Sequence, residues 1–147
     1  MNGSQVVACS DEHFGNANNI LLPDKSKNMG NGWETRRRRG MGYDWVLIKL
    51  GLSGYPTSFE INTHYFKGNY PDCFSVQAID HNKNISINSI ITNSKKWKTI
   101  IAKTKLKPDS SLKIKMLKKF YKKYNYIKLN IYPDGGISRF RIYGKIK

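Results

Sequence analysis

Four consecutive arginines, Arg36 to Arg39, form the densest group of residues in the sequence that could bind or transform a ligand. Adjacent cations repel one another, so a fold tolerates them more readily where carboxylates or an anionic ligand neutralise them. Glu34 and Asp44 are the nearest acids along the chain. Because the run lies between Trp33 and an apolar stretch rather than in a polar tail, we predict a specific anion site or a set of structural ion pairs. A solvated basic patch is the weaker alternative.

Two more arginines, Arg139 and Arg141, alternate with Phe140 and Ile142. On a strand, successive side chains point to opposite faces, so both guanidinium groups should leave the face opposite the apolar pair. Two parallel guanidinium groups on a rigid strand are suited to hold a carboxylate, and we predict such a clamp. Ion pairs with acids on neighbouring strands are the alternative.

A histidine and an asparagine lie near the end of a predicted strand. His64 shares the polar face of residues 57–66 with Glu60 and Asn62, and imidazole can transfer protons near neutral pH. A hydrogen-bonded structural histidine is an alternative of equal weight. Asn69 follows Gly68 and is either a turn residue or a contact to a substrate amide.

Metal and nucleotide chemistry have little support in the sequence. It contains none of the common metal, dinucleotide or nucleoside-triphosphate motifs. Asp11, Glu12 and His13 are adjacent, and we interpret them as part of a loop at one end of the fold. A divalent metal bound by Asp11, Glu12 or His64 stays an open alternative. No ligand spacing requires one, so neither a metal site nor a cofactor is predicted.

The charge of the chain is strongly positive. Its 147 residues include 26 Lys and Arg against 10 Asp and Glu, a formal net charge of +16. The Lys-rich segment 95–128 contains a single acid, Asp109. Such a surplus suits nucleic acid or an acidic partner, but the sequence has no RRM, KH or zinc-finger signature, so we rank nucleic-acid binding low.

Localisation is inferred from patterns that the sequence lacks. No apolar run reaches the roughly 18 residues of a membrane span, and residues 1–10 do not have the pattern of a secretion signal. Cys9 and Cys73 fit neither a disulfide framework nor zinc-ligand spacing. We therefore expect a cytoplasmic protein with reduced thiols and no membrane partner.

Short strands separated by Gly, Pro, Asn and Asp must position these residues. We predict one domain over residues 1–147, an all-β sandwich or jelly roll. Pro133-Asp134-Gly135-Gly136 predicts a hairpin that joins strands over 126–132 and 137–143. Further strands are expected over 5–9, 43–50, 57–66, 73–79 and 85–91, with a strand followed by a loop or helical turn in 110–124.

Several stretches together resemble the allantoicase family. The longest matches are Asn28-Met29-Gly30-Asn31-Gly32-Trp33-Glu34-Thr35-Arg36-Arg37-Arg38-Arg39-Gly40, Asn62-Thr63-His64-Tyr65-Phe66-Lys67-Gly68-Asn69-Tyr70-Pro71-Asp72 and Leu129-Asn130-Ile131-Tyr132-Pro133-Asp134-Gly135-Gly136-Ile137-Ser138-Arg139. Within them, the strings from Trp33 to Arg39 and from Asn130 to Gly136 are highly specific together. Shorter matches are Ala8-Cys9-Ser10-Asp11-Glu12-His13-Phe14-Gly15 and Asp44-Trp45. The resemblance covers residues 6–80 and 125–146 and is weak in the Lys-rich segment between them.

The resemblance implies a jelly-roll sandwich of the galactose-binding-like type and hydrolysis of allantoate to ureidoglycolate and urea in purine breakdown. Glu34 or His64 would then transfer protons, with Asp44 as an orienting group. Residues expected to hold the substrate carboxylate and ureido groups are Arg36, Arg37, Arg38, Asn69, Arg139 and Arg141. A related enzyme acting on ureidoglycolate, and a non-catalytic ligand-binding module, are the alternatives.

The sequence departs from the family pattern in three ways. Family members usually carry two repeats, whereas this chain has one that is most similar to the second repeat. Tyr43 stands where the family usually has His, and Lys118-Lys119-Phe120 stands where another His is common. We therefore expect a homo-oligomer, or a complex with a separate first-repeat chain.

Overall fold

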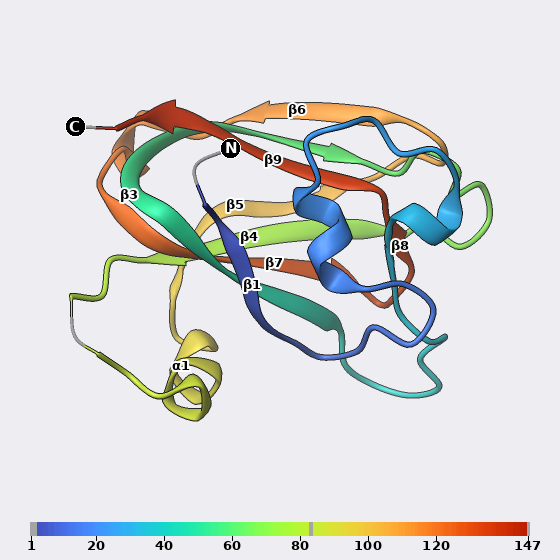
Figure 1. The fold of residues 1–147 in the computed structure, drawn as a ribbon, viewed down its shortest axis with the longest axis horizontal. Coiled ribbons are helices and arrows are strands. Elements are labelled where there is room, and N and C mark those ends of the chain that lie inside the picture. Colours follow the sequence, from blue (N-terminus) through green and yellow to red (C-terminus); the bar gives the residue numbers. More distant parts are fainter. Residues whose placement is uncertain (1–2, 83, 147) are drawn as a thin grey trace.

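The computed structural model describes residues 3–82 and 84–146, which form two antiparallel sheets packed face to face (Figure 1). The first sheet runs in the order β1 (Gln5–Cys9), β3 (Asp44–Asn62), β7 (Tyr124–Tyr132), β4 (Cys73–Ile79) and β5 (Lys98–Lys105). In the second sheet, β3 pairs with both β6 (Ser111–Lys115) and β9 (Arg139–Lys145). The predicted all-β sandwich is confirmed.

Strand β3 belongs to both sheets. Its first half pairs with β1 and β7, and its second half pairs with β6 and β9. The pairing register with β7 shifts between Lys49 and Gly54, where the strand passes from one sheet to the other. A Cβ atom on Gly54 would lie 3.0 Å from the carbonyl oxygen of Lys145, so a glycine permits this close approach. The prediction that a strand ends before Gly51 is therefore wrong, because the two predicted strands are halves of one.

The core lies between the two sheets. Phe59 and Ile61 from β3 meet Phe140 from β9, and all three are at most 1% exposed. The rings of Phe59 and Phe140 stack with 5.8 Å between centroids. Because Phe140 faces the core, Arg139 and Arg141 leave β9 on its other face, as the alternation predicts.

A small ribbon closes one end of the sandwich. It pairs β2 (Trp33–Glu34) with β8 (Gly136–Ile137), and the fully buried ring of Trp33 anchors it to the core. The short 3₁₀ helices η1 (Ala17–Leu21) and η2 (Met29–Asn31) lie beside it (Figure 1). The ribbon therefore fixes the start of the arginine run.

The predicted hairpin around residues 133–136 does not form. Strand β7 pairs with β3 and β4, and β9 pairs with β3 and not with β7. The Pro-Asp-Gly-Gly loop instead carries the chain through β8 from the first sheet to the second. Turn residues show where a chain reverses, but they do not determine which strand it pairs with next.

Residues 85–91 were predicted to form a strand, but the segment forms α1 (Ile87–Ser94). The Ser86 hydroxyl accepts a hydrogen bond from the backbone N–H of Ser89 and caps the helix. The apolar residue Ile90 packs against Leu47 and Trp97 on the outer face of the first sheet. This packing outweighs the β preference of the isoleucines.

The remaining predictions are mostly confirmed. Strands β1 and β4 have the predicted bounds, and 110–124 contains β6 followed by the 3₁₀ turn η3 (Lys118–Phe120). The strand predicted over 57–66 ends at Asn62, and β5 was not predicted because lysines dominate its solvent-facing positions. Within residues 3–82 and 84–146, no helix is long and apolar enough to cross a membrane.

Candidate functional site

The arginine run lines a cavity of about 310 Å³ together with Asp11, Met41 and Asp44, here called the arginine cavity. The backbone of the run is held at both ends. The backbone N–H of Thr35 donates to the carbonyl of Gly135 at 3.1 Å, and the backbone N–H of Arg38 donates to Asp134 Oδ2 at 2.7 Å. Residues almost 100 positions away thus hold the run in place.

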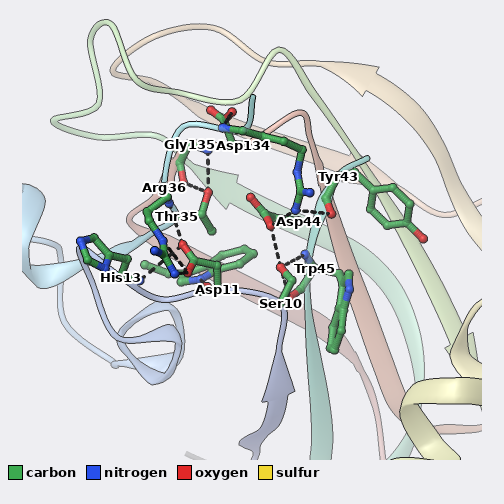
Figure 2. Close-up of polar contacts among 12 residues, drawn as sticks. Ser10, Asp11, His13, Thr35, Arg36, Tyr43, Asp44, Trp45, Asp134 and Gly135 are labelled. Carbon is green, nitrogen blue, oxygen red and sulfur yellow. Dashed lines mark hydrogen bonds and ion pairs between the residues drawn. The ribbon is translucent and has the colours of Figure 1, made fainter. Parts of the chain in front are cut away.

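Arg38 forms a partly buried ion pair with Asp44. Its Nη2 lies 2.6 Å from Asp44 Oδ1, and the Asp44 side chain is 2% exposed. The hydroxyl of Ser10 donates to the same carboxylate oxygen at 2.8 Å (Figure 2). Charge-assisted bonds in such a site are short and strong. Asp44 therefore neutralises one arginine of the run, as its place in the sequence predicts.

Arg36 is paired with Asp11, an acid that sequence spacing does not single out. The backbone N–H of Arg36 donates to Asp11 Oδ2 at 2.6 Å, and its Nε lies 3.5 Å from Oδ1 (Figure 2). Burial disfavours the charged form of Asp11, but backbone hydrogen bonds from Arg36 and His13 outweigh it and lower the pKa of the carboxyl. Asp11 is thus an anion that holds Arg36 in place.

The other two arginines keep a free positive charge. Arg37 and Arg39 are exposed, and neither guanidinium has a hydrogen bond or ion pair within the described part of the chain. Nε of Arg38 is buried and also has no partner there. The arginine cavity therefore has four cations, two carboxylates and spare N–H donors, a combination that attracts anions.

A second cavity, of about 490 Å³, lies beside β9 and the end of β3. We call it the His64 cavity; its lining includes His64, Glu60, Asn62, Asp109, Arg139 and Arg141. Nδ1 of His64 lies 3.9 Å from Asp109 Oδ1, and both side chains are about half exposed. His64 is thus accessible but does not share a cavity with the arginine run.

Arg139 is buried and fully occupied by the protein. Its guanidinium donates to the carbonyl oxygens of Asn19 (3.1 Å), Asp24 (2.7 Å), Asn31 (2.7 Å) and Ser138 (2.6 Å), and also to Asn31 Oδ1. The side chain is 2% exposed. Arg139 therefore connects β9 to the loops around η1 and η2, and this structural role replaces the expected half of a carboxylate clamp.

Arg141 is less constrained than Arg139. Its Nη1 and Nη2 donate to the carbonyls of Ile20 and Asp24 at 3.2 and 3.3 Å, and the side chain is half-buried. Arg36 to Arg39 and the pair Arg139 and Arg141 thus line different cavities of one chain. The expected convergence of both groups on one ligand does not occur within a single copy.

Glu34 contacts Asn69 instead of the arginines. The amide Nδ2 of Asn69 donates to Glu34 Oε1 at 2.5 Å. The bond joins β2 to the loop after β3, and neither residue lines the arginine cavity or the His64 cavity. Two predicted site residues are thus brought together, and of the two nearest acids along the chain only Asp44 forms an ion pair with the run among the described residues.

The acids near the N-terminus do not gather into a metal site. Asp11 faces Arg36, and Glu12 Oε2 accepts the backbone N–H of Ala17 at 2.9 Å. Over residues 3–82 and 84–146, no group of three or more His, Cys, Asp or Glu side chains could hold a metal ion. The role of Asp11 as partner of Arg36 could have been suspected only from its place in the family-like stretch of residues 8–15.

Comparisons with known proteins agree with the motifs. A family model described as the allantoicase repeat matches residues 1–147. A probable allantoicase from Stutzerimonas stutzeri is 42% identical over 99% of this chain and 44% of its own length. One from Acinetobacter baumannii is 41% identical over 99% of this chain and 43% of its own. The chain thus spans less than half the length of the curated relatives it matches.

Solved structures show the same fold. Allantoicase from Saccharomyces cerevisiae matches with a TM-score of 0.83 and 32% identity, over 98% of this chain and 41% of the yeast chain. An F-lectin from striped bass matches with a TM-score of 0.70 and 12% identity, over 99% of this chain and 46% of its own. A likeness at such low identity shows the fold alone, and it confirms the sandwich of the galactose-binding-like type.

Proposed function

Because the chain belongs to the allantoicase family, we propose that it catalyses the hydrolysis of allantoate to ureidoglycolate and urea. The observation that carries the proposal is the arginine cavity, which four arginines and two carboxylates line together. Allantoate has one carboxylate and two ureido groups on one carbon. It therefore brings the negative charge and the carbonyl oxygens that such a cavity attracts.

The substrate carboxylate is assigned to Arg37 and Arg39. These two guanidinium groups are the ones in the run that lack an acid partner in the described residues. Arg38 is held by Asp44 at 2.6 Å, so its remaining N–H groups have fixed positions, whereas the guanidinium of Arg36 contacts Asp11 only at 3.5 Å. Fixed donors suit the ureido oxygens, since donors that do not rearrange stabilise a developing charge most.

Proton transfer is assigned to Glu34. In the reaction a water oxygen bonds to the central carbon, the bond from that carbon to one ureido nitrogen breaks, and this nitrogen gains a proton as urea leaves. Glu34 precedes Arg36 by two residues, and the bond from Asn69 orients its carboxylate. Neither Glu34 nor His64 lines the arginine cavity, but Glu34 lies on the segment that leads into the run, and this favours it over His64.

The working unit is proposed to contain two repeats, this one and either a second copy or a separate first-repeat chain. Two observations support this. The curated relatives are more than twice as long as the stretch that matches, and the predicted site residues are divided between two cavities of this repeat. We place the protein in the cytoplasm, where the free thiols of Cys9 and Cys73 stay reduced.

Urea release tests the proposed function. The purified chain is assayed with allantoate and with ureidoglycolate, alone and mixed with the part of the Stutzerimonas stutzeri relative that this chain does not match. Light scattering gives the mass of each sample. Urea from allantoate supports the proposal, and urea from ureidoglycolate alone would assign a related ureide reaction. No urea from either substrate, with the protein folded by circular dichroism, would refute it.

A further inference from the structure

The His64 cavity has no part in the reaction as assigned above, and its electrostatics differ from those of the arginine cavity. Three acids and, besides His64, three bases line it: Asp24, Glu60, Asp109, Lys25, Arg139 and Arg141. The formal charges of these six side chains balance, whereas the arginine cavity has two surplus cations. A balanced, polar cavity selects a neutral ligand that both donates and accepts hydrogen bonds.

One buried acceptor in the lining has no partner. Asn62 is 8% exposed, and its Nδ2 donates to Glu60 Oε1 at 3.3 Å. Its Oδ1 is buried without a hydrogen bond from any described residue. The carboxylate of Glu60 can only accept, so the amide N–H must face it and the carbonyl must face away. An unpaired buried acceptor is unfavourable, and a ligand N–H would satisfy it.

Arg141 can donate hydrogen bonds to an acceptor atom of the ligand. A guanidinium has five N–H groups, and the hydrogen bonds of Arg141 are to Ile20 and Asp24, at 3.2 and 3.3 Å. Glu60 is held by two other residues of the lining, because Tyr143 Oη donates to it at 2.8 Å and Ser111 Oγ at 3.2 Å. The cavity thus presents fixed acceptors near one end of β3 and spare donors from β9.

We propose that the His64 cavity binds a neutral, planar urea-type group, with its N–H donors on Asn62 Oδ1 and Glu60 and its carbonyl oxygen on Arg141. Urea and the ureido group have this pattern of donors and acceptor on one plane. The choice of a urea-type ligand over a simple carboxamide rests on the proposed function, since urea is the product and the ureido group is part of the substrate. The location of the site rests on Asn62 and the charge balance.

The test is an NMR titration of ¹⁵N-labelled protein with methylurea, and with acetate as a charged probe of similar size. We expect saturable shifts at residues lining the His64 cavity for methylurea and none there for acetate. Asn62→Leu should weaken methylurea binding about tenfold, the factor for one lost hydrogen bond. Asn130→Leu is the matched control. Asn130 is 2% exposed, its Oδ1 is also unpaired in the described residues, and it lines neither cavity.

Three results would overturn the proposal. The first is the absence of methylurea shifts at the cavity, and the second is an affinity for methylurea that Asn62→Leu leaves unchanged. The third is an equal loss of methylurea affinity in Asn62→Leu and Asn130→Leu. If Asn62→Leu does not fold, Arg141→Met takes its place, because it removes the donors expected to bind the ligand carbonyl. The same titration should then show weaker methylurea binding, and unchanged binding would overturn the proposal. Urea release is measured on the same wild-type sample. Methylurea binding without urea release would support this site and refute the proposed function. Urea release without methylurea binding would support the proposed function and refute this site.

Discussion

Replacing Arg139 with methionine separates a structural arginine from a substrate clamp. The guanidinium is 2% exposed and donates to carbonyls of Asn19, Asp24, Asn31 and Ser138. Methionine fills much of the same space but has no donor, so the change leaves buried carbonyl oxygens unpaired. We therefore expect Arg139→Met to destabilise the fold rather than only to weaken ligand binding.

The size of the loss follows from the number of bonds. A hydrogen bond to a charged group contributes about 1.5–3 kcal/mol. Loops near the surface recover water on some carbonyls, so we count two bonds as lost and expect a free energy of unfolding lower by about 3–6 kcal/mol. In a domain of this size each kcal/mol lowers Tm by about 2–4 °C, which gives a decrease on the order of 10 °C.

Thermal and urea unfolding of Arg139→Met and Arg141→Met measure this loss. Arg141 is the matched control, since it lies on the same strand and face but makes two longer bonds from a half-buried side chain. We expect it to cost less than about 1 kcal/mol. A Tm of Arg139→Met within experimental error of wild type, or equal losses in both variants, would refute the structural role of Arg139.

Three further predictions concern single side chains. Burial lowers the pKa of Lys128 from 10.5 to about 8, so the unfolded chain binds more protons between these values and stability should rise with pH from about 8 to 10. Lys128→Met should abolish that rise and stabilise the protein at pH 7 by roughly 3 kcal/mol in chemical unfolding. Hydrogen bonds lower the pKa of Asp11 below 3.8, so Asp11→Asn should destabilise at pH 7, and the difference in stability from wild type should vanish as the pH falls through the native pKa. Glu34→Gln should reduce urea release at least about 100-fold with Tm unchanged; equal rates would remove Glu34 from proton transfer.

The strands that alternate cleanly could be predicted from the sequence. Strand β4 has the predicted bounds, and Arg139 and Arg141 leave β9 on the face opposite Phe140. The pairing of strands could not be predicted in the same way, since the loop at 133–136 marks a reversal but not the change of sheet that follows. The helix α1 depends on apolar contacts with the first sheet that local propensity does not contain.

In the site, too, some features could be predicted from the sequence and others could not. Its chemistry was predictable, because a run of arginines needs acids or an anion, and Asp44 does pair with Arg38 at 2.6 Å. Which distant residues share a cavity was not predictable. The partner of Arg36 is Asp11, 25 positions earlier, and the separation of Arg139 from the run depends on loops around η1 and η2 that the strand pattern does not determine.

Calorimetric titration with allantoate tests most directly whether Arg37 and Arg39 bind the substrate carboxylate. The double variant Arg37→Met/Arg39→Met is compared with Lys118→Met/Lys119→Met, which removes the same charge from exposed positions of η3. We predict that the Kd for allantoate rises at least about tenfold in the arginine variant, because charge-assisted bonds to the carboxylate are lost, and changes little in the lysine variant. Equal affinities in wild type and the arginine variant would contradict the assignment.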